Sequence, residues 1–143
     1  MSTARQDPAT IDRMLDEAET WAVVGLGENP ERTAYSIAAL LQERGKRIVP
    51  IHPMFADPDA PAVLGEKGYP TRADVPFPVD VVDVFRRSEA AGQFADEAVA
   101  IGAGGVWFQL GVIDEDAFAR TTAAGVPMVM DTCPAIEWRK RGR

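Results

Sequence analysis

Five short apolar runs divide the chain at regular intervals, and segments with helical spacing of apolar residues lie between them. Runs of four to eight apolar residues that end at glycine or polar residues are typical of buried strands. The five runs cover residues 21–26, 47–51, 79–85, 106–110 and 126–130. Strands that alternate with helices indicate right-handed crossovers and a parallel sheet. We therefore predict an α/β, three-layer Rossmann-like fold, with an open parallel sheet of about five strands and helices on both faces, as a single domain over residues 1–143.

Capping residues mark where the helices begin. Asp7 precedes Pro8, which is typical of an N-cap followed by a first-turn proline, and Asp114 precedes a further amphipathic segment. Thr33 and Ser88 are predicted to cap the helices that follow the first and third strands. A terminal helix is expected over residues 135–140. Residues 53–78 are rich in proline, aspartate and glycine, which predicts a long irregular segment with a short strand near residues 62–64.

Composition excludes several classes of function. The net charge of −7 disfavours general binding of nucleic acid, whose phosphates require a basic surface. Basic residues gather at 139–143, where we expect a solvated tail. One cysteine and one histidine rule out a disulfide framework and a multi-cysteine metal site. No apolar run approaches the ~20 residues of a membrane helix, and residues 1–7 have no apolar core of a signal peptide, so the expected location is the cytoplasm.

The first strand ends in a glycine turn that suits a phosphate. Open parallel sheets bind ligands beyond the carboxyl ends of their strands. Gly25, Leu26 and Gly27 stand between a strand and a helix, where glycine lets the backbone approach a pyrophosphate. The third glycine of the dinucleotide pattern would fall at Pro30, so the match is partial. A purely structural turn is the alternative.

The later strand ends narrow the choice of ligand. His52 and Pro53 follow the second strand, where an NAD enzyme usually has an acidic residue for the ribose, so NAD is disfavoured. Arg32 is placed to pair with phosphate oxygens, with a surface ion pair to Glu28 or Glu31 as the alternative. Arg86 and Arg87 follow the third strand, where one of them can reach a ligand. The alternative interpretation is that both are ordinary surface arginines.

The residues offer little for catalysis. No serine, histidine and acid are placed as a triad. Cys133 follows a strand and precedes a helix, which can lower the pKa of a thiol and would allow a mixed disulfide with a thiol ligand, although a packed, inert cysteine is the more common outcome. Asp80 and Asp83 are three residues apart on a strand and so face opposite sides. We expect no enzyme activity.

Four segments together resemble a known family. They are residues 22–32, 48–53, 81–89, and 106–112 with 130–137. In this order they resemble the small stand-alone CoA-binding proteins, whose domain is similar to the nucleotide-binding domain of the succinyl-CoA synthetase alpha subunit. The resemblance implies a Rossmann-like fold with coenzyme A lying across the strand ends.

The resemblance also assigns roles to residues. The loop from Gly25 to Arg32, with Thr33, would surround the diphosphate; His52 and Pro53, where the family usually has Asn-Pro, would border the nucleoside. The remaining rim would consist of Phe85, Arg86, Arg87, Gln109 and Gly111. This chain departs from the family at Gly27 and Ala34, where serine is common, and at Glu28, whose negative charge opposes a phosphate.

Three functions follow from these observations. The first is a non-catalytic or regulatory module that binds coenzyme A or an acyl-CoA at the carboxyl ends of the strands. The second is an interaction protein on a Rossmann scaffold that has lost its ligand, which Glu28 and the missing serines favour. The third is a small NAD(P)-binding protein. No feature of the sequence decides whether the chain forms a homodimer.

Overall fold

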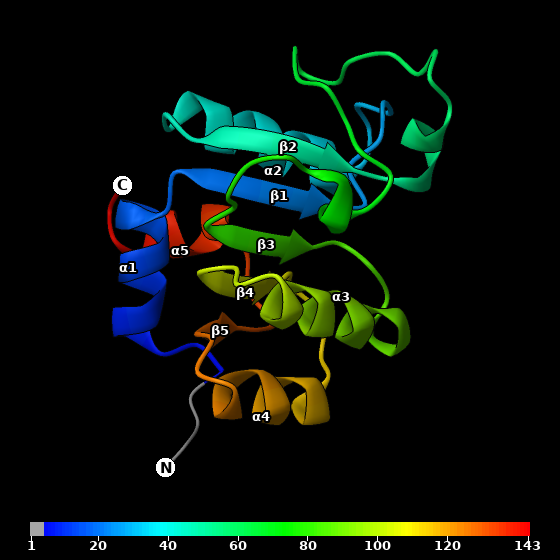
Figure 1. The fold of residues 1–143 in the computed structure, drawn as a ribbon. Coiled ribbons are helices and arrows are strands. Elements are labelled where there is room, and N and C mark those ends of the chain that lie inside the picture. The colour runs from blue at the N-terminus through cyan, green and yellow to red at the C-terminus, as the bar shows by residue number, and fades with distance from the viewer. Residues whose placement is uncertain (1–4) are drawn as a thin grey trace.

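The predicted parallel sheet is confirmed. The computed structural model describes residues 5–143, and the expectation for residues 1–4 lies outside that range. Five parallel strands lie in the order β2-β1-β3-β4-β5 (Figure 1). Their bounds are β1 (Thr20–Val24), β2 (Arg47–Ile51), β3 (Val81–Val84), β4 (Gly105–Phe108) and β5 (Met128–Val129). Except for β2, the strands are shorter than the apolar runs that predicted them, because the runs continue into buried residues of the neighbouring loops.

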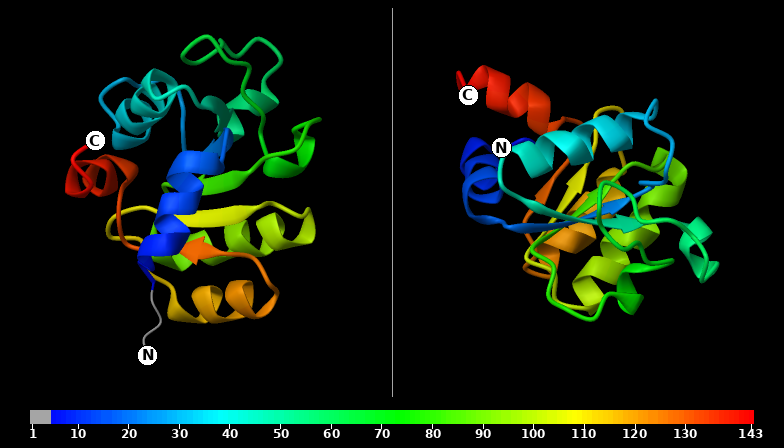
Figure 2. Two further views of the ribbon diagram at one scale, coloured as in Figure 1. Left: turned by 90° about the vertical axis from the view of Figure 1, so that its left-hand side faces the viewer. Right: turned by 90° about the horizontal axis from the view of Figure 1, so that it is seen from above.

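Helices cover both faces of the sheet, as predicted. Their bounds are α1 (Pro8–Glu17), α2 (Thr33–Glu43), α3 (Ser88–Ala100), α4 (Glu115–Ala123) and α5 (Pro134–Lys140). The view from above places α1, α2 and α5 on one side of the sheet and α3 and α4 on the other (Figure 2). The three layers enclose two cores. Among the described residues, no helix has the length and apolar character needed to cross a membrane.

Alternate residues of each strand face the two cores. Trp21, Val23 and Trp107 pack under α1, α2 and α5, with the two indole rings 5.7 Å apart. Ala22 and Val24, the intervening residues of β1, pack under α3. Because both faces are covered, a strand residue is buried whichever way it points, which explains the continuous apolar runs in the sequence.

Two of the four predicted caps are confirmed. The Asp7 carboxylate accepts a hydrogen bond from the Thr10 N–H at 3.0 Å, and that of Asp114 accepts one from the Ala117 N–H at 3.0 Å. Each carboxylate therefore satisfies a first-turn N–H that an α-helix leaves without an internal acceptor.

The other two predicted caps are wrong. The N-cap of α2 is Arg32 rather than Thr33, and that of α3 is Arg87 rather than Ser88; neither arginine caps with its side chain. The Ser88 hydroxyl has other partners. It accepts from the Ile113 N–H at 2.9 Å and donates to the Gly111 carbonyl at 3.3 Å. Ser88 thus holds the loop after β4 instead of its own helix.

The long segment after β2 is irregular, as expected, but it contains no named strand near residues 62–64. Val63 forms only an isolated bridge with Glu66. Two 3-10 turns, η1 (Pro53–Ala56) and η2 (Arg72–Asp74), interrupt the segment. Between them Tyr69 returns beside the end of β2, where its carbonyl accepts from the His52 N–H at 3.1 Å. This pairing anchors the segment next to the strand ends.

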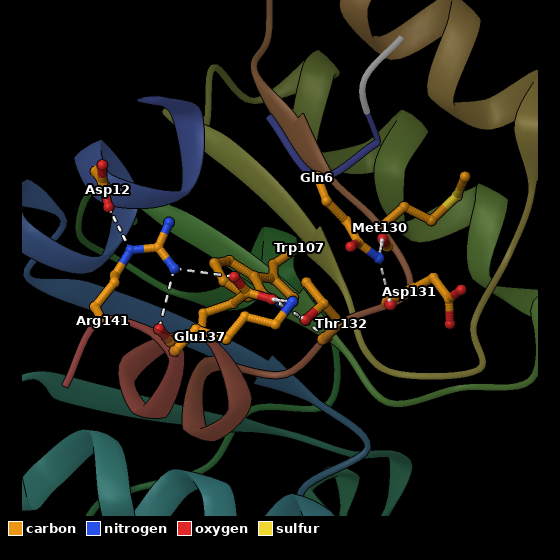
Figure 3. A network of polar contacts seen from close by, with 9 residues as sticks. Gln6, Asp12, Trp107, Met130, Asp131, Thr132, Glu137 and Arg141 are labelled. Atoms are coloured by element: carbon orange, nitrogen blue, oxygen red, sulfur yellow. Dashed lines mark hydrogen bonds and ion pairs between the residues drawn. The ribbon is translucent and has the colours of Figure 1, made fainter. Parts of the chain in front are cut away.

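The basic carboxyl terminus is largely exposed, as the sequence predicts, but ion pairs also attach it to α1. Arg141 donates to Asp12 of α1 and, at 3.0 Å, to Glu137, which also accepts from the Thr132 hydroxyl (Figure 3). Arg143 pairs with Asp16 of the same helix. These acidic residues of α1 provide partners that the charge pattern of the tail alone does not reveal.

Gly25 follows β1 directly, at the point where the ends of β1, β2 and β3 come together. Its N–H donates to the Ile51 carbonyl at 2.8 Å, which holds the end of β2. Its backbone has φ of +100°, and a Cβ built there would lie 2.7 Å from the Phe85 carbonyl oxygen beyond β3. Only glycine satisfies both conditions, since a side chain would be strained and would press on backbone.

Replacing Gly25 by alanine should cost about 2–5 kcal/mol of the free energy of unfolding, because left-handed strain adds to steric overlap. Gly45→Ala is the matched control: Gly45 has φ of +84°, but a Cβ there would have no neighbour within 4 Å. It should lose only the strain, about 1–2 kcal/mol. Urea denaturation measures both, and equal losses would contradict the close approach at Gly25.

Candidate functional site

A cavity of about 920 Å³ lies at the carboxyl ends of β1, β2 and β3. The chain proceeds from β1 to β2 on one side and later to β3 on the other, so this is the topological switch point at which open α/β sheets bind ligands. The cavity is lined by Gly25, Gly27, Glu28, Asn29, Glu31, Arg32, Thr33, Ala34, His52, Pro53, Met54, Phe85, Arg86 and Arg87. Its volume lies in the upper part of the range of about 300–1,000 Å³ usual for small-molecule sites.

The loop between β1 and α2 turns the start of the helix toward this cavity. The Asn29 side-chain oxygen accepts from the Glu31 N–H at 2.9 Å, and the Asn29 carbonyl accepts from the Arg32 N–H at 3.2 Å. The turn delivers Thr33 and Ala34, the first residues of α2, to the cavity wall. The Arg32 carbonyl accepts from the Tyr35 and Ser36 N–H groups, and the Arg32 side chain does not cap the helix, so the N–H groups of Thr33 and Ala34 and the positive end of the helix dipole are available to an anion.

His52 closes the side of the cavity that follows β2. Its Nδ1 accepts a hydrogen bond from the Met54 N–H at 3.0 Å, so the neutral ring carries its proton on Nε2. The Cδ2 and Nε2 edge faces Gly27, where a Cβ would lie 3.3 Å from Cδ2 and 3.5 Å from Nε2. Burial, followed by the positive charges of Arg86 and Arg32, lowers the pKa of His52 below its ordinary value. The imidazole is therefore neutral at pH 7.

Three arginines bring positive charge to the cavity. Arg32 is exposed and forms no ion pair with Glu28 or Glu31 in the described part of the chain. Arg86 stacks on the Phe94 ring of α3, 5.6 Å from its centroid. The surface ion pair predicted as the alternative for Arg32 is therefore absent from residues 5–143, which leaves this guanidinium available.

Arg87 is almost fully exposed. Its side chain is 85% exposed and pairs with Glu89 at 3.3 Å. Glu28 and Glu31 also line the cavity and partly offset the arginines. The charge of the cavity lining is therefore mixed. Cationic side chains come from the β1–α2 loop and the β3–α3 loop, and the two carboxylates come from the β1–α2 loop.

Nine of the thirteen predicted site residues line the cavity together. They are Gly25, Gly27, Arg32, Thr33, His52, Pro53, Phe85, Arg86 and Arg87. Four do not: Leu26 is fully buried in the core, Pro30 is exposed outside the lining, and Gln109 and Gly111 lie on the loop after β4. The cavity occupies the ends of the first three strands and does not extend to the fourth.

Gln109 and Gly111 have structural partners instead. Gln109 is 4% exposed and donates from Nε2 to the Asp83 carboxyl at 2.6 Å. The Gly111 N–H donates to the Asp131 carboxylate at 2.7 Å. Burial raises the pKa of Asp83 to about 8, although the hydrogen bond from Gln109 lowers it in part. A protonated, buried carboxyl therefore holds Gln109 in the core, away from the ligand position that the resemblance implies.

Cys133 is a packed core residue. It is 8% exposed, belongs to the cluster under α1, α2 and α5, and is not among the cavity residues. Burial raises the pKa of its thiol, against the lowering that its place before α5 suggests. The hypothesis of a mixed disulfide with a ligand in the cavity has no structural support.

Asn29 and Glu31 line the cavity as part of the loop predicted to surround the diphosphate, although neither was singled out, whereas Met54 lies outside every segment assigned to the ligand. Asn29 precedes a proline, and Asn-Pro is a common turn signal, so its position was open to inference. Met54 gives no such signal, because its place depends on the 3-10 turn η1 that folds back from His52. The completed site offers guanidinium groups, free helix N–H groups and a glycine turn, which suit a phosphate-containing ligand.

Comparisons with known proteins agree with this chemistry. A family model described as the CoA binding domain matches residues 19–139. The uncharacterized protein YneT of Bacillus subtilis (strain 168) is 32% identical over 125 residues, which are 87% of this chain and 89% of YneT.

Two solved structures have the same fold. A hypothetical protein from Pyrococcus horikoshii OT3 is 28% identical, with a TM-score of 0.84 and coverage of 98% of both chains. A protein from Thermus thermophilus is 31% identical, with a TM-score of 0.83 over 92% of this chain and 96% of its own.

Asp83→Asn should change how stability depends on pH. The folded protein holds the Asp83 proton up to about pH 8, whereas the unfolded chain releases it near its ordinary pKa of 3.8. The stability that this group contributes is therefore complete below the unfolded pKa and is lost progressively as pH rises toward about 8.

Asparagine has nearly the same shape as the protonated acid, and its side-chain oxygen can still accept from Gln109. Because its side chain does not ionise, the variant should gain stability relative to the wild type as pH rises from 5.5 to 8.5. Thermal unfolding across this range measures the difference, and parallel profiles would contradict a protonated Asp83.

Proposed function

The chain belongs to the CoA-binding-domain family, and from this we propose that it binds coenzyme A or an acyl-CoA in the cavity at the ends of β1, β2 and β3. The observation that carries the proposal is that Arg32 and Arg86 line one cavity together with the start of α2 and the Gly25–Gly27 turn. A diphosphate needs positive charge, N–H donors and a backbone that it can approach closely, and this cavity provides all three.

We propose a binding or regulatory role without a reaction. None of the cavity-lining residues is a serine or cysteine, and the Nδ1 atom of His52 already accepts from the Met54 N–H. The chain's single cysteine and its protonated Asp83 are buried in the cores. The side chains at the cavity therefore suit positioning of an anion better than attack on a bond.

An interaction protein that has lost its ligand is the second candidate. Glu28 and Glu31 favour it, because carboxylates in the phosphate loop repel an anionic ligand. An NAD(P)-binding protein is the weaker alternative, since His52 stands where the ribose-binding acid would be.

The proposal includes a cytoplasmic location. Cys133 is a free, buried thiol, so the fold needs no disulfide and is compatible with a reducing compartment. The proposed partner is the small-molecule ligand, and neither nucleic acid nor a membrane is part of the proposal.

Coenzyme A should raise the melting temperature of the purified protein, whereas NAD and NADP should not. A ligand that binds only the folded state adds about 2.7 kcal/mol of stability at a hundred times its Kd. Thermal unfolding in the presence of coenzyme A, acetyl-CoA, NAD, NADP and ATP measures this. A higher melting temperature with NAD alone would favour the dinucleotide alternative, and no change with any compound would favour the protein that has lost its ligand.

Arg32→Ala and Arg86→Ala should each weaken coenzyme A binding by about 1.5–3 kcal/mol, roughly 10- to 150-fold in Kd, because each removes hydrogen bonds to a charged group. Arg139→Ala is the matched control, since it removes the same charge from an exposed residue of α5 outside the cavity. Titration calorimetry measures all three. Equal losses for all would mean that only net charge matters, and unchanged affinity at Arg32 and Arg86 would exclude their roles.

A further inference from the structure

His52 is the one histidine of the chain and lines the cavity together with its charged groups. Its ring is held in place at Nδ1 by the Met54 N–H, while the Nε2 edge faces the Gly27 turn. The Phe55 ring meets the imidazole edge-on, with centroids 6.5 Å apart. The imidazole therefore has one nitrogen engaged by the backbone and one nitrogen beside the position proposed for a phosphate.

Charged side chains reach this cavity from two elements. The β1–α2 loop contributes Glu28, Glu31 and Arg32, and the β3–α3 loop contributes Arg86 and Arg87. The 3-10 turn η1, which follows His52, contains no charged residue. Burial and the fields of Arg86 and Arg32 all favour the neutral imidazole in the absence of ligand.

We propose that His52 makes ligand binding proton-linked: when a phosphate-containing ligand occupies the cavity, the imidazole takes up one proton from solvent at Nδ1 and gives up its hydrogen bond from the Met54 N–H. The inference rests on the proposed function and adds to it a dependence on pH. The proton bonds to the Nδ1 lone pair, and no other covalent bond changes.

The reason is that ligand binding changes the sign of the electrostatic field at the His52 imidazole. Two guanidinium charges disfavour imidazolium when the cavity holds only water. A ligand diphosphate beside Arg32 and the Gly27 turn offsets these charges and places negative charge near His52, which favours the protonated ring.

Proton uptake also moves the ring, because an imidazolium donates from both nitrogens and accepts at neither. The neutral ring accepts the Met54 N–H at 3.0 Å, so the protonated ring must turn away from that donor. Loss of this hydrogen bond opposes proton uptake, and the attraction between imidazolium and the ligand phosphate has to exceed it. The expected rearrangement is a small reorientation of His52 with ligand bound.

Affinity should then depend on pH in a defined direction. His52 is neutral in the free protein and charged in the complex over the interval between its two pKa values. Binding therefore tightens as pH falls through that interval and levels off below it. If ligand binding raises the pKa of His52 by one pH unit, the protein with protonated His52 binds the ligand about tenfold more tightly than the protein with neutral His52.

The test compares the wild type with His52→Asn, measuring the Kd for coenzyme A by titration calorimetry between pH 5.5 and 8. The asparagine side-chain oxygen can accept the Met54 N–H as Nδ1 does, so the turn after β2 is preserved. A ligand phosphate itself titrates near pH 6, but it does so with both proteins. The ratio of wild-type to variant affinity therefore isolates His52, and it should rise several-fold to tenfold as pH falls toward 5.5.

A second measurement follows the ring directly. In untagged protein every histidine ring signal belongs to His52, so its pKa can be read by NMR with and without saturating coenzyme A. A higher pKa in the complex, with a rising affinity ratio, supports the inference. An unmoved pKa with retained binding would overturn this inference alone, whereas absence of binding at every pH would overturn the proposed function as well.

Discussion

The close approach of three strand ends at Gly25 is the constraint on which the site depends. The Gly25 N–H bonds to the end of β2, and its α-carbon lies against the Phe85 carbonyl at the end of β3. Without a side chain at this position, the β1–α2 loop and the β3–α3 loop come near enough to share one cavity. Arg32 and Arg86 belong to different loops, and it is this contact that brings their charges to the same space.

The cavity balances attraction against repulsion. Arg32 and Arg86 together with the free N–H groups of α2 attract an anion, while Glu28 and Glu31 oppose it. The positive groups also act on His52, whose ring they help to keep neutral. The carboxylates reduce the net field without forming ion pairs to Arg32 in the described residues, so the guanidinium stays available for an external partner.

Burial shifts the pKa of two titratable groups, His52 after β2 and Asp83 within β3, with different consequences. After β2, it keeps His52 neutral at the surface of the cavity, where a ligand can reach it. Within β3, it keeps Asp83 protonated in the core, where Gln109 is its hydrogen-bond partner. The same physical effect therefore leaves one titratable group available to a ligand and withdraws the other, together with Gln109, from the site.

The order of elements, the parallel sheet and the place of the glycine turn after β1 followed from the sequence, because apolar period and glycine placement are local properties of the chain. The sequence also identified most of the cavity residues, since the carboxyl ends of parallel strands share one edge. Only the tertiary structure decided the partners of polar side chains. Gln109 turned to Asp83, Ser88 to the loop after β4, and Arg141 to Asp12, over separations of 26, 25 and 129 residues. No local pattern encodes such pairings, because each depends on where distant segments meet after the sheet has formed.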